Sequence, residues 1–241
     1  MRQQPLLLGF SVVSLGAHLL GWALFAAAEQ VDSGVLAALL HLLGIAIYAG
    51  SLLWMMEGFT KVGLSLAQGQ TLAWKEVSPG ACRRSGRLCL CLGALAAALA
   101  ATGLITGLLW SLLLLALPAM SVVPALLGLI ATGAVILSQL FGPCLVVDTG
   151  LSTTSVFRQG VWLLEHHWAG LIELSGYLLT LLLLPFLAGL LAEALLEGLG
   201  IAATVVSLVV VLPLITTSVT GAYWQLRPEL ANAGSIKRSG R

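Results

Sequence analysis

Residues 88–147 read LCLCLGALAAALAATGLITGLLWSLLLLALPAMSVVPALLGLIATGAVILSQLFGPCLVV, sixty residues without one charged side chain. A single helix of that length would extend about 90 Å, whereas the hydrocarbon core of a bilayer is about 30 Å thick. The stretch must therefore fold back, and Pro118 and Pro124 supply the helix-breaking residues for a turn. Because three spans would leave no residues for connections, the stretch predicts two membrane spans, residues 88–117 and 121–147.

The composition of the whole chain agrees with a membrane location. Hydrophobic residues make up 59% of the 241 residues and charged residues 9%, whereas about a quarter of a soluble domain is charged. So many apolar side chains could not be hidden in one core. The net charge of +1 gives no indication of a nucleic-acid partner. The sequence thus predicts a multi-pass membrane protein.

Six apolar stretches are long enough to cross a bilayer as helices. The first is longer than the 7–15 residue apolar region of a signal peptide, so we expect it to be retained. The predicted fold is all-α, an integral membrane bundle of six transmembrane helices in a single domain over residues 1–228. We expect residues 229–241 to form a disordered cytoplasmic tail. The six predicted spans are residues 6–28, 34–56, 88–117, 121–147, 169–192 and 200–224.

The basic residues alternate between the two sides of these spans. All eleven Lys and Arg residues lie before span 1, between spans 2 and 3, between spans 4 and 5, or after span 6. The opposite connections contain acids only, Glu29, Asp32, Glu193 and Glu197. Because Lys and Arg in short loops are retained in the cytoplasm, this pattern predicts that both termini are cytoplasmic.

The two longer inner connections have a helical period. In the first, Phe59, Val62 and Leu66 share one face, and Ala73 extends it. In the second, an apolar stripe begins at Phe157 and ends at Trp168. Both patterns predict amphipathic interfacial helices on the cytoplasmic face. The helices either join spans and cover the inner rim of the bundle, or also sense lipid or dock a partner.

Six basic residues in these connections are candidates for contact with lipid headgroups or with a partner protein. The same residues are also explained as determinants of the membrane orientation. They are Lys61, Lys75, Arg83, Arg84, Arg87 and Arg158.

Landmark residues recur in order across the two inner connections and suggest an internal repeat. Gly58 and Trp74 correspond to Gly150 and Trp168 in this comparison, with spacings that differ by up to two residues. A parallel repeat would relate spans 2 and 3 to spans 4 and 5. Chance recurrence of Gly and Trp is the alternative.

Two segments resemble a prokaryotic family of multi-pass membrane proteins of unknown function. The first is MEGFTKVGLSLAQGQTLAWKEV at residues 56–77, followed by CRRSGR at residues 82–87, and the second is GPCLVVDTGLSTTSVFRQGVWLLEHHW at residues 142–168. More distantly, residues 34–228 are similar to the membrane domain of some glycerophosphodiester phosphodiesterases. The resemblance implies a six-helix membrane module in a prokaryotic inner membrane or a thylakoid-type membrane. It implies no catalytic residues, because the catalytic domain is missing from the chain.

Glu173 is the one acid inside a predicted span, where an ionisable side chain marks a candidate functional site. One hypothesis is an ion pair with Arg158 near the inner surface. The others are a substrate or proton site, and a span that begins later than predicted.

His18 and His41 are the other candidates for an intramembrane polar site. They lie in spans 1 and 2, and counting from the inner surface places them within about one turn of each other. Two facing imidazoles can bind a metal or haem iron. Alternatively, each bonds a backbone carbonyl or the other histidine. Because no third ligand is near them in sequence, we predict no metal and no cofactor.

The cysteines map to the inner side of the membrane, where a reducing compartment disfavours disulfides. His166 and His167 lie at the same level, so a mixed Cys/His site is the alternative to a packing role. The cysteines are Cys82, Cys89, Cys91 and Cys144.

The sequence contains no HExxH, GxSxG, Walker or dinucleotide-binding motif and no paired intramembrane Asp, so we predict no enzymatic activity. Two functions remain open. The first is a non-catalytic accessory or scaffold protein that acts on lipids or a larger membrane complex through its cytoplasmic face. The second is a small-solute transporter with a path between the span 2–3 and span 4–5 hairpins, for which the mid-span Pro185 and Pro213 are the evidence. The expected partners are the lipid bilayer and other membrane proteins, and not nucleic acid.

Overall fold

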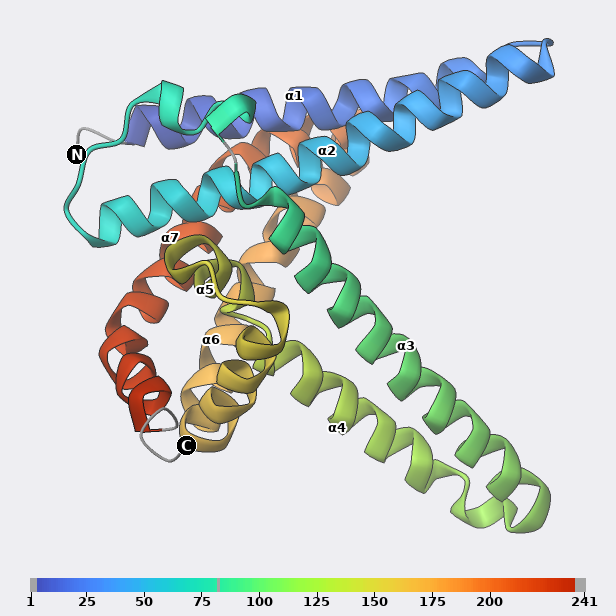
Figure 1. Ribbon diagram of the computed structural model, residues 1–241. Coiled ribbons are helices and arrows are strands. Elements are labelled where there is room, and N and C mark those ends of the chain that lie inside the picture. The colour runs from blue at the N-terminus through green and yellow to red at the C-terminus, as the bar shows by residue number, and fades with distance from the viewer. Residues whose placement is uncertain (1–3, 82, 237–241) are drawn as a thin grey trace. The chain divides into compact units, whose positions relative to one another are not determined.

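The computed structural model describes residues 4–81 and 83–236, which fold into helices joined by short connections (Figure 1). No strand occurs in this described part of the chain. In order, the elements are α1 (Gln4–Glu29), α2 (Gly34–Ala67), η1 (Trp74–Glu76), η2 (Pro79–Ala81), α3 (Ser85–Ala116), η3 (Pro118–Met120), α4 (Val122–Ser138), α5 (Gly142–Thr149), α6 (Thr153–Leu195) and α7 (Gly200–Ile236).

Within residues 4–81 and 83–236, six helical segments are long and apolar enough to cross a membrane. α4 and α5 together form one of them, Val122–Thr149. The all-α fold with six spans is therefore confirmed, and the turn predicted between Pro118 and Pro124 is η3 with the start of α4. At the C-terminus, α7 continues to Ile236 and so enters the tail predicted to be disordered.

The chain divides into two compact units. Unit 1 comprises Met1–Ser85 and Gly176–Gln225, and unit 2 comprises Gly86–Ser175 and Leu226–Arg241. The long helices α6 and α7 therefore each contribute one part to unit 1 and the other part to unit 2.

In unit 1, α1 and α2 form an antiparallel hairpin, side by side in Figure 1. Glycine allows the two helices to approach closely, because a side chain at Gly21 would lie 3.1 Å from the backbone nitrogen of Tyr48. At the end of the hairpin where α1 begins, the ring of Phe10 lies edge-on to that of Phe59, with centroids 4.9 Å apart. In both facing pairs, Gly21 with Tyr48 and Phe10 with Phe59, the two residue numbers add up to 69. A constant sum means that the two antiparallel helices keep the same register along the hairpin. The buried core at the same end of the hairpin consists of Leu7, Phe10, Phe59, Val62 and Val77.

The first predicted interfacial helix differs from the structure. Residues 59–66 belong to α2, which continues past the predicted end of span 2 to Ala67, and Phe59 and Val62 face the core of unit 1. The chain then turns at Gly69, whose φ of +69° favours glycine. Glu57, which directly follows the predicted end of span 2 at residue 56, lies within this helix.

The C-terminal half of α2 packs on α7 through Gly63. A side chain at this position would lie 2.5 Å from Thr220 Oγ1 and 3.0 Å from Thr216 Cγ2. The hydroxyls of α7 bond to carbonyls of their own helix, as Thr216 Oγ1 does to Leu212 O at 2.9 Å and Thr220 Oγ1 to Thr216 O at 2.7 Å. Both hydroxyl protons therefore have an acceptor within α7, and the two threonine side chains can pack directly on the glycine.

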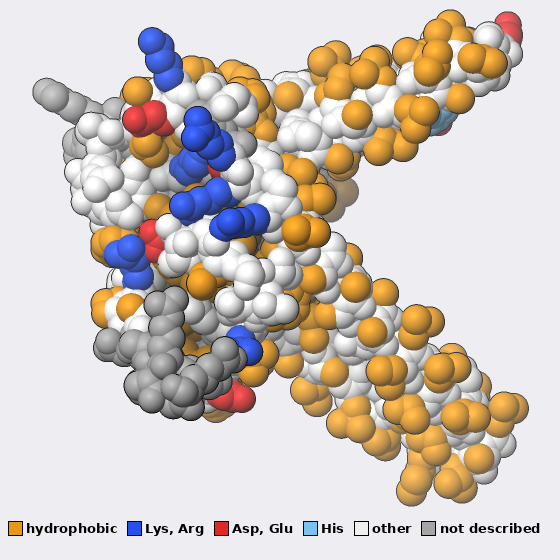
Figure 2. Space-filling model, in the orientation of Figure 1, with side chains coloured by type: hydrophobic (Ala, Val, Ile, Leu, Met, Phe, Trp, Pro, Cys, Tyr) orange, Lys and Arg blue, Asp and Glu red, His pale blue; other side chains and the backbone are white. Residues whose placement is uncertain are grey.

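In unit 2, α3 and α4 form a second hairpin, in which Gly128 lies against the side chain of Thr106 (Figure 1). Hydrophobic side chains cover the visible face of this hairpin in Figure 2, as expected for a surface in contact with lipid. The second predicted interfacial helix is the first part of α6, which kinks at His167 (φ −131°, ψ 26°). The face of this segment that packs inside unit 2 contains Val156 and Leu163, whereas Val161 and Trp168 of the predicted apolar stripe are exposed.

Replacing Gly63 by alanine should destabilise the packing of α2 on α7, because the new methyl group overlaps Thr220. Overpacking of this kind costs about 1–3 kcal/mol. The thermal unfolding temperature of the detergent-solubilised protein is the measurement. Gly50→Ala in the same helix is the matched control, since nothing lies within 4 Å of a side chain there, and it should leave stability unchanged or slightly raised. Equal unfolding temperatures for the two variants would contradict this packing.

Candidate functional site

Glu57 of α2 is fully buried, the only charged residue in the described chain with so little exposure. Its Oε1 lies 2.9 Å from Lys61 Nζ, one turn further along the helix. The backbone N–H of Arg84 donates to both carboxylate oxygens at 3.2 Å, and Ser85 Oγ donates to Oε2 at 2.7 Å. All these groups belong to unit 1. The carboxylate is thus neutralised by one cation and held by neighbouring donors.

These contacts place a negative charge at the beginning of α3, which starts at Ser85. The first amides of a helix have no partner within the helix, and the helix dipole favours an anion there. Glu57 supplies that anion from a different helix. The carboxylate therefore fixes the point at which the connection between α2 and α3 ends.

The rest of this connection, residues 68–84, is also held on α2 and α1, and we call it the basic loop. Trp54 Nε1 donates to Val77 O at 2.7 Å. Phe10 lies between the rings of Trp54 and Trp74, with centroids 5.1 Å and 6.2 Å away. Within the loop, the carboxylate of Glu76 accepts the N–H of Ala73 at 3.1 Å. Residues 73–77 of the basic loop have a defined conformation as a result.

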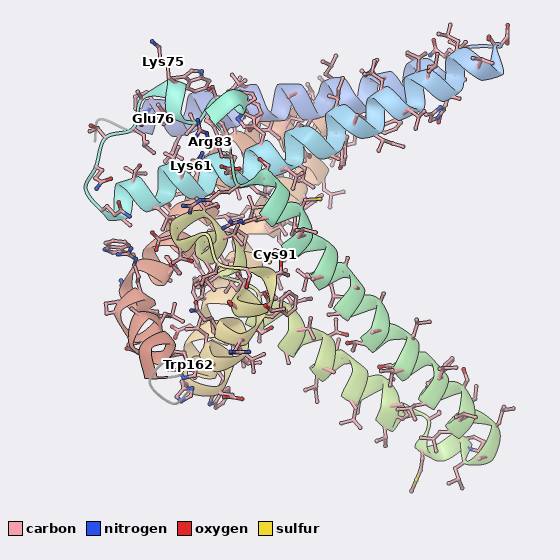
Figure 3. The ribbon with its side chains drawn as sticks, in the orientation of Figure 1. Lys61, Lys75, Glu76, Arg83, Cys91 and Trp162 are labelled. Atoms are coloured by element: carbon pink, nitrogen blue, oxygen red, sulfur yellow. The ribbon has the colours of Figure 1, made fainter. Side chains whose placement is uncertain are left out.

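The basic candidates in unit 1 fall into two groups. Lys61 is paired with Glu57, and the backbone of Arg84 is bonded to it. Lys75 and Arg83 are exposed, and neither forms an ion pair with any residue that the structure describes. Figure 3 shows the Lys75 side chain pointing away from the helices that carry the loop. Two cations of the basic loop are therefore available to an external anion.

In unit 2, polar contacts gather at the end of α5. Arg227 Nε donates to Asp148 Oδ2 at 2.7 Å, and the Arg87 guanidinium donates to the carbonyl of Gly150. Arg158, the remaining basic candidate, is exposed and has no ion pair among the described residues. Arg87 and Arg227 therefore stabilise contacts within unit 2.

The two intramembrane histidines do not face each other, contrary to the prediction. His18 Nδ1 lies 3.2 Å from Ser51 Oγ, and its ring lies on that of Tyr48, with centroids 3.8 Å apart. His41 bonds instead to Ala37 O at 2.8 Å, in its own helix. In the register of the hairpin, the residue opposite His41 is Ala28, ten positions after His18 in the sequence. Ten helical residues correspond to about 15 Å, too far for a shared ligand.

The structure does not bring the remaining candidate residues together in one site. Glu173 is exposed, and within the described residues no ion pair joins it to Arg158. Cys91 and Cys144 are buried free thiols, Cys89 is an exposed one, and Cys82 lies outside the described residues. No group of three or more His, Cys, Asp or Glu side chains in the described chain could hold a metal ion. The mixed Cys/His site therefore has no support from the structure.

Sequence reasoning did not identify Glu57 as a candidate residue, because it lies directly after the predicted end of span 2. The signal that could have identified it is Lys61 one helical turn away, since such i, i+4 pairs neutralise an acid within a helix. The donors from residues 84 and 85 could not be found this way, because they are far from Glu57 in sequence.

Comparison of the chain with models of protein families, with curated proteins and with solved structures found no match in any of the three.

Replacing Glu57 by alanine should destabilise the protein strongly, since it leaves the Lys61 ammonium and the donors at the start of α3 without their acceptor. Removing one partner of a buried ion pair costs about 3–5 kcal/mol. Glu57→Gln keeps a carbonyl acceptor and should cost less, and adding Lys61→Met to Glu57→Gln should recover stability. Thermal unfolding in detergent measures all three. The control is Glu76→Gln, an exposed acid with one backbone donor, and a loss as large as that of Glu57→Ala there would contradict the assignment.

Proposed function

We propose that the protein is a non-catalytic accessory protein of the membrane that binds anionic phospholipids through its basic loop. The observation that carries this proposal is that some charged residues of unit 1 are paired inside the protein, whereas two cations of the basic loop are exposed. The buried acid Glu57 is occupied by Lys61 and by the start of α3, whereas Lys75 and Arg83 remain exposed on a loop of defined conformation.

The tryptophan next to Lys75 in sequence supports a position of the basic loop at the membrane interface. Trp74 precedes Lys75 and is 42% exposed. Trp side chains favour the headgroup level of a bilayer, where an apolar ring and a polar N–H are both accommodated. Each Lys or Arg near an anionic surface contributes about 1 kcal/mol to binding. A loop with a half-exposed tryptophan and two exposed cations therefore fits a lipid phosphate better than it fits a neutral solute.

We also propose that the basic loop and both termini face the cytoplasm of a prokaryotic inner membrane or thylakoid-type membrane. This orientation is supported by the distribution of Lys and Arg described above. It would place the basic loop against the leaflet to which anionic lipids contribute a negative surface potential.

The orientation predicts a labelling pattern in intact cells. In a variant without its native cysteines, Asp32→Cys in the connection between α1 and α2 should react with a membrane-impermeant maleimide added outside. Restoring Cys82 instead should give labelling only after the cells are opened. Labelling of Cys82 from the outside would reverse the orientation.

Lipid binding predicts a charge-dependent effect of the basic loop. After purification from a bilayer of mixed phosphatidylglycerol and phosphatidylethanolamine, native mass spectrometry should find phosphatidylglycerol enriched on the protein. The Lys75→Gln/Arg83→Gln variant should lose that enrichment, by about 30-fold in affinity for two bases. Arg158→Gln removes a cation from unit 2 and should retain it. Unchanged enrichment in the double variant, or an equal loss in Arg158→Gln, would refute specific binding by this loop.

One observation favours the second candidate, a small-solute transporter. The span formed by α4 and α5 is interrupted between Ser138 and Gly142, and transporters often build their sites from discontinuous helices. Swelling of proteoliposomes in glycerol or urea tests this function. Permeation above that of protein-free vesicles, abolished by Gln139→Leu, would favour transport over lipid binding.

A further inference from the structure

The connection between α4 and α5 lies within a segment that is apolar enough to cross a membrane, Val122–Thr149. The regular helical hydrogen bonds stop there. The amides of Gln139, Leu140 and Gly142 bond to carbonyls only three residues earlier, at 3.1 Å, 3.3 Å and 2.9 Å. Such a break is tolerated in a membrane protein where it is buried in protein or contacts water.

The side chain of Gln139 is buried at this break, with 6% of its surface exposed. Its Nε2 donates to Ser138 Oγ at 3.2 Å. Ser138 Oγ donates its only proton to Val135 O at 2.9 Å, so it can only accept from Gln139. The amide orientation is thereby fixed, because an inverted amide would place two acceptors together. Gln139 Oε1 consequently has no donor among the described residues.

Two glycines shape the surroundings of this amide. A side chain at Gly160 of α6 would overlap the Ser138 carbonyl and lie 2.8 Å from Gln139 Nε2, so the α6 backbone covers the amide nitrogen. On the other side, a Cβ at Gly142 would lie 3.7 Å from Gln139 Oε1, 3.7 Å from Cys91 Sγ and 3.8 Å from Val156 Cγ1. The amide oxygen therefore borders the position at which Gly142 lacks a side chain.

A second buried acceptor occurs on the helix that covers the break. Gln159 precedes Gly160, and its Oε1 also has no donor. These two glutamines carry the only buried side-chain oxygen or nitrogen atoms without a partner in the described part of the chain. Since buried polar groups are nearly always bonded, the unpaired Gln139 Oε1 at the interruption indicates a ligand that donates a hydrogen bond.

We propose that the α4–α5 break is a buried water-binding site, at which a water molecule donates a hydrogen bond to Gln139 Oε1 beside Gly142. The three atoms nearest to that position belong to an amide oxygen, a thiol and a methyl group, and no group of three or more His, Cys, Asp or Glu side chains in the described residues could hold a metal ion. A metal cation would lose its hydration there with no opposite charge to compensate. Water is neutral, donates to the oxygen, and is the usual partner of buried polar groups left unpaired by the protein. This site lies in unit 2 and does not depend on lipid binding by the basic loop.

Water-edited solid-state NMR of the labelled protein in bilayers tests the site. A gadolinium chelate in the bulk solvent suppresses signals that arise from surface water. Under these conditions, magnetisation should still pass from water to the Gln139 side chain and to the Gly142 amide, while transfer to the exposed Gln70 is lost. Absence of transfer at Gln139 and Gly142 would overturn the proposal, and this measurement on the unmodified chain needs no variant to fold.

The variant Gln139→Met keeps the length of the side chain and removes its acceptor. Transfer to the Gly142 amide should then fall to the level of the apolar amides in the middle of α4. The control Gln70→Met, in the exposed part of the basic loop, should leave transfer to Gly142 unchanged. Persistence of the Gly142 signal in a folded Gln139→Met protein would show that the water is not held by Gln139, and the proposal would be wrong.

Discussion

The buried carboxylate of Glu57 is the charge on which the packing of unit 1 around the start of α3 depends. An isolated ion in a low-dielectric interior costs several kcal/mol, so the chain must bring compensating groups to it. Lys61 comes from the same helix, but the other donors come from the start of α3. Satisfying one buried acid thus determines where α3 begins and where the basic loop ends. The loop gains a defined conformation from a requirement that is internal to the protein.

The apolar parts of the helices meet a different requirement, because lipid competes equally for apolar side chains. Close packing then depends on small residues and on hydroxyls that are already bonded. Gly63 against Thr216 and Thr220 in unit 1 and Gly128 against Thr106 in unit 2 are both of this kind. The hydroxyls of Thr216 and Thr220 bond within their own helix, so both the oxygen and the methyl group of Thr220 can lie close to Gly63 without leaving a donor unpaired. The apolar parts of the helices thus associate through close packing at glycine residues. The buried carboxylate of Glu57 instead holds the end of the basic loop.

The fold could be predicted from the sequence far better than the candidate site. Hydropathy is summed over about twenty residues, so the six spans and the turn at Pro118 survive errors at single positions. The prediction for His18 and His41 needed the register of two helices, which Gly21 and Gly44 determine through close contact with Tyr48 and Phe25. Composition carries no information on register. The predicted span 2 also ends one residue before Glu57, whereas α2 continues past this acid, which Lys61 neutralises one turn later.

Glu57 and Gln139 show two ways in which a polar side chain can be accommodated within a segment that crosses a membrane. Glu57 is charged, and its acceptors are saturated by protein donors, so exchange of any partner would cost the full desolvation of an ion. Gln139 is neutral and retains one acceptor without a donor, which a small molecule can satisfy at little cost. The first arrangement suits a fixed anchor for a surface loop, and the second suits a point at which a helix is interrupted. The sequence distinguishes neither, because burial, and not residue type, decides which oxygen still needs a partner.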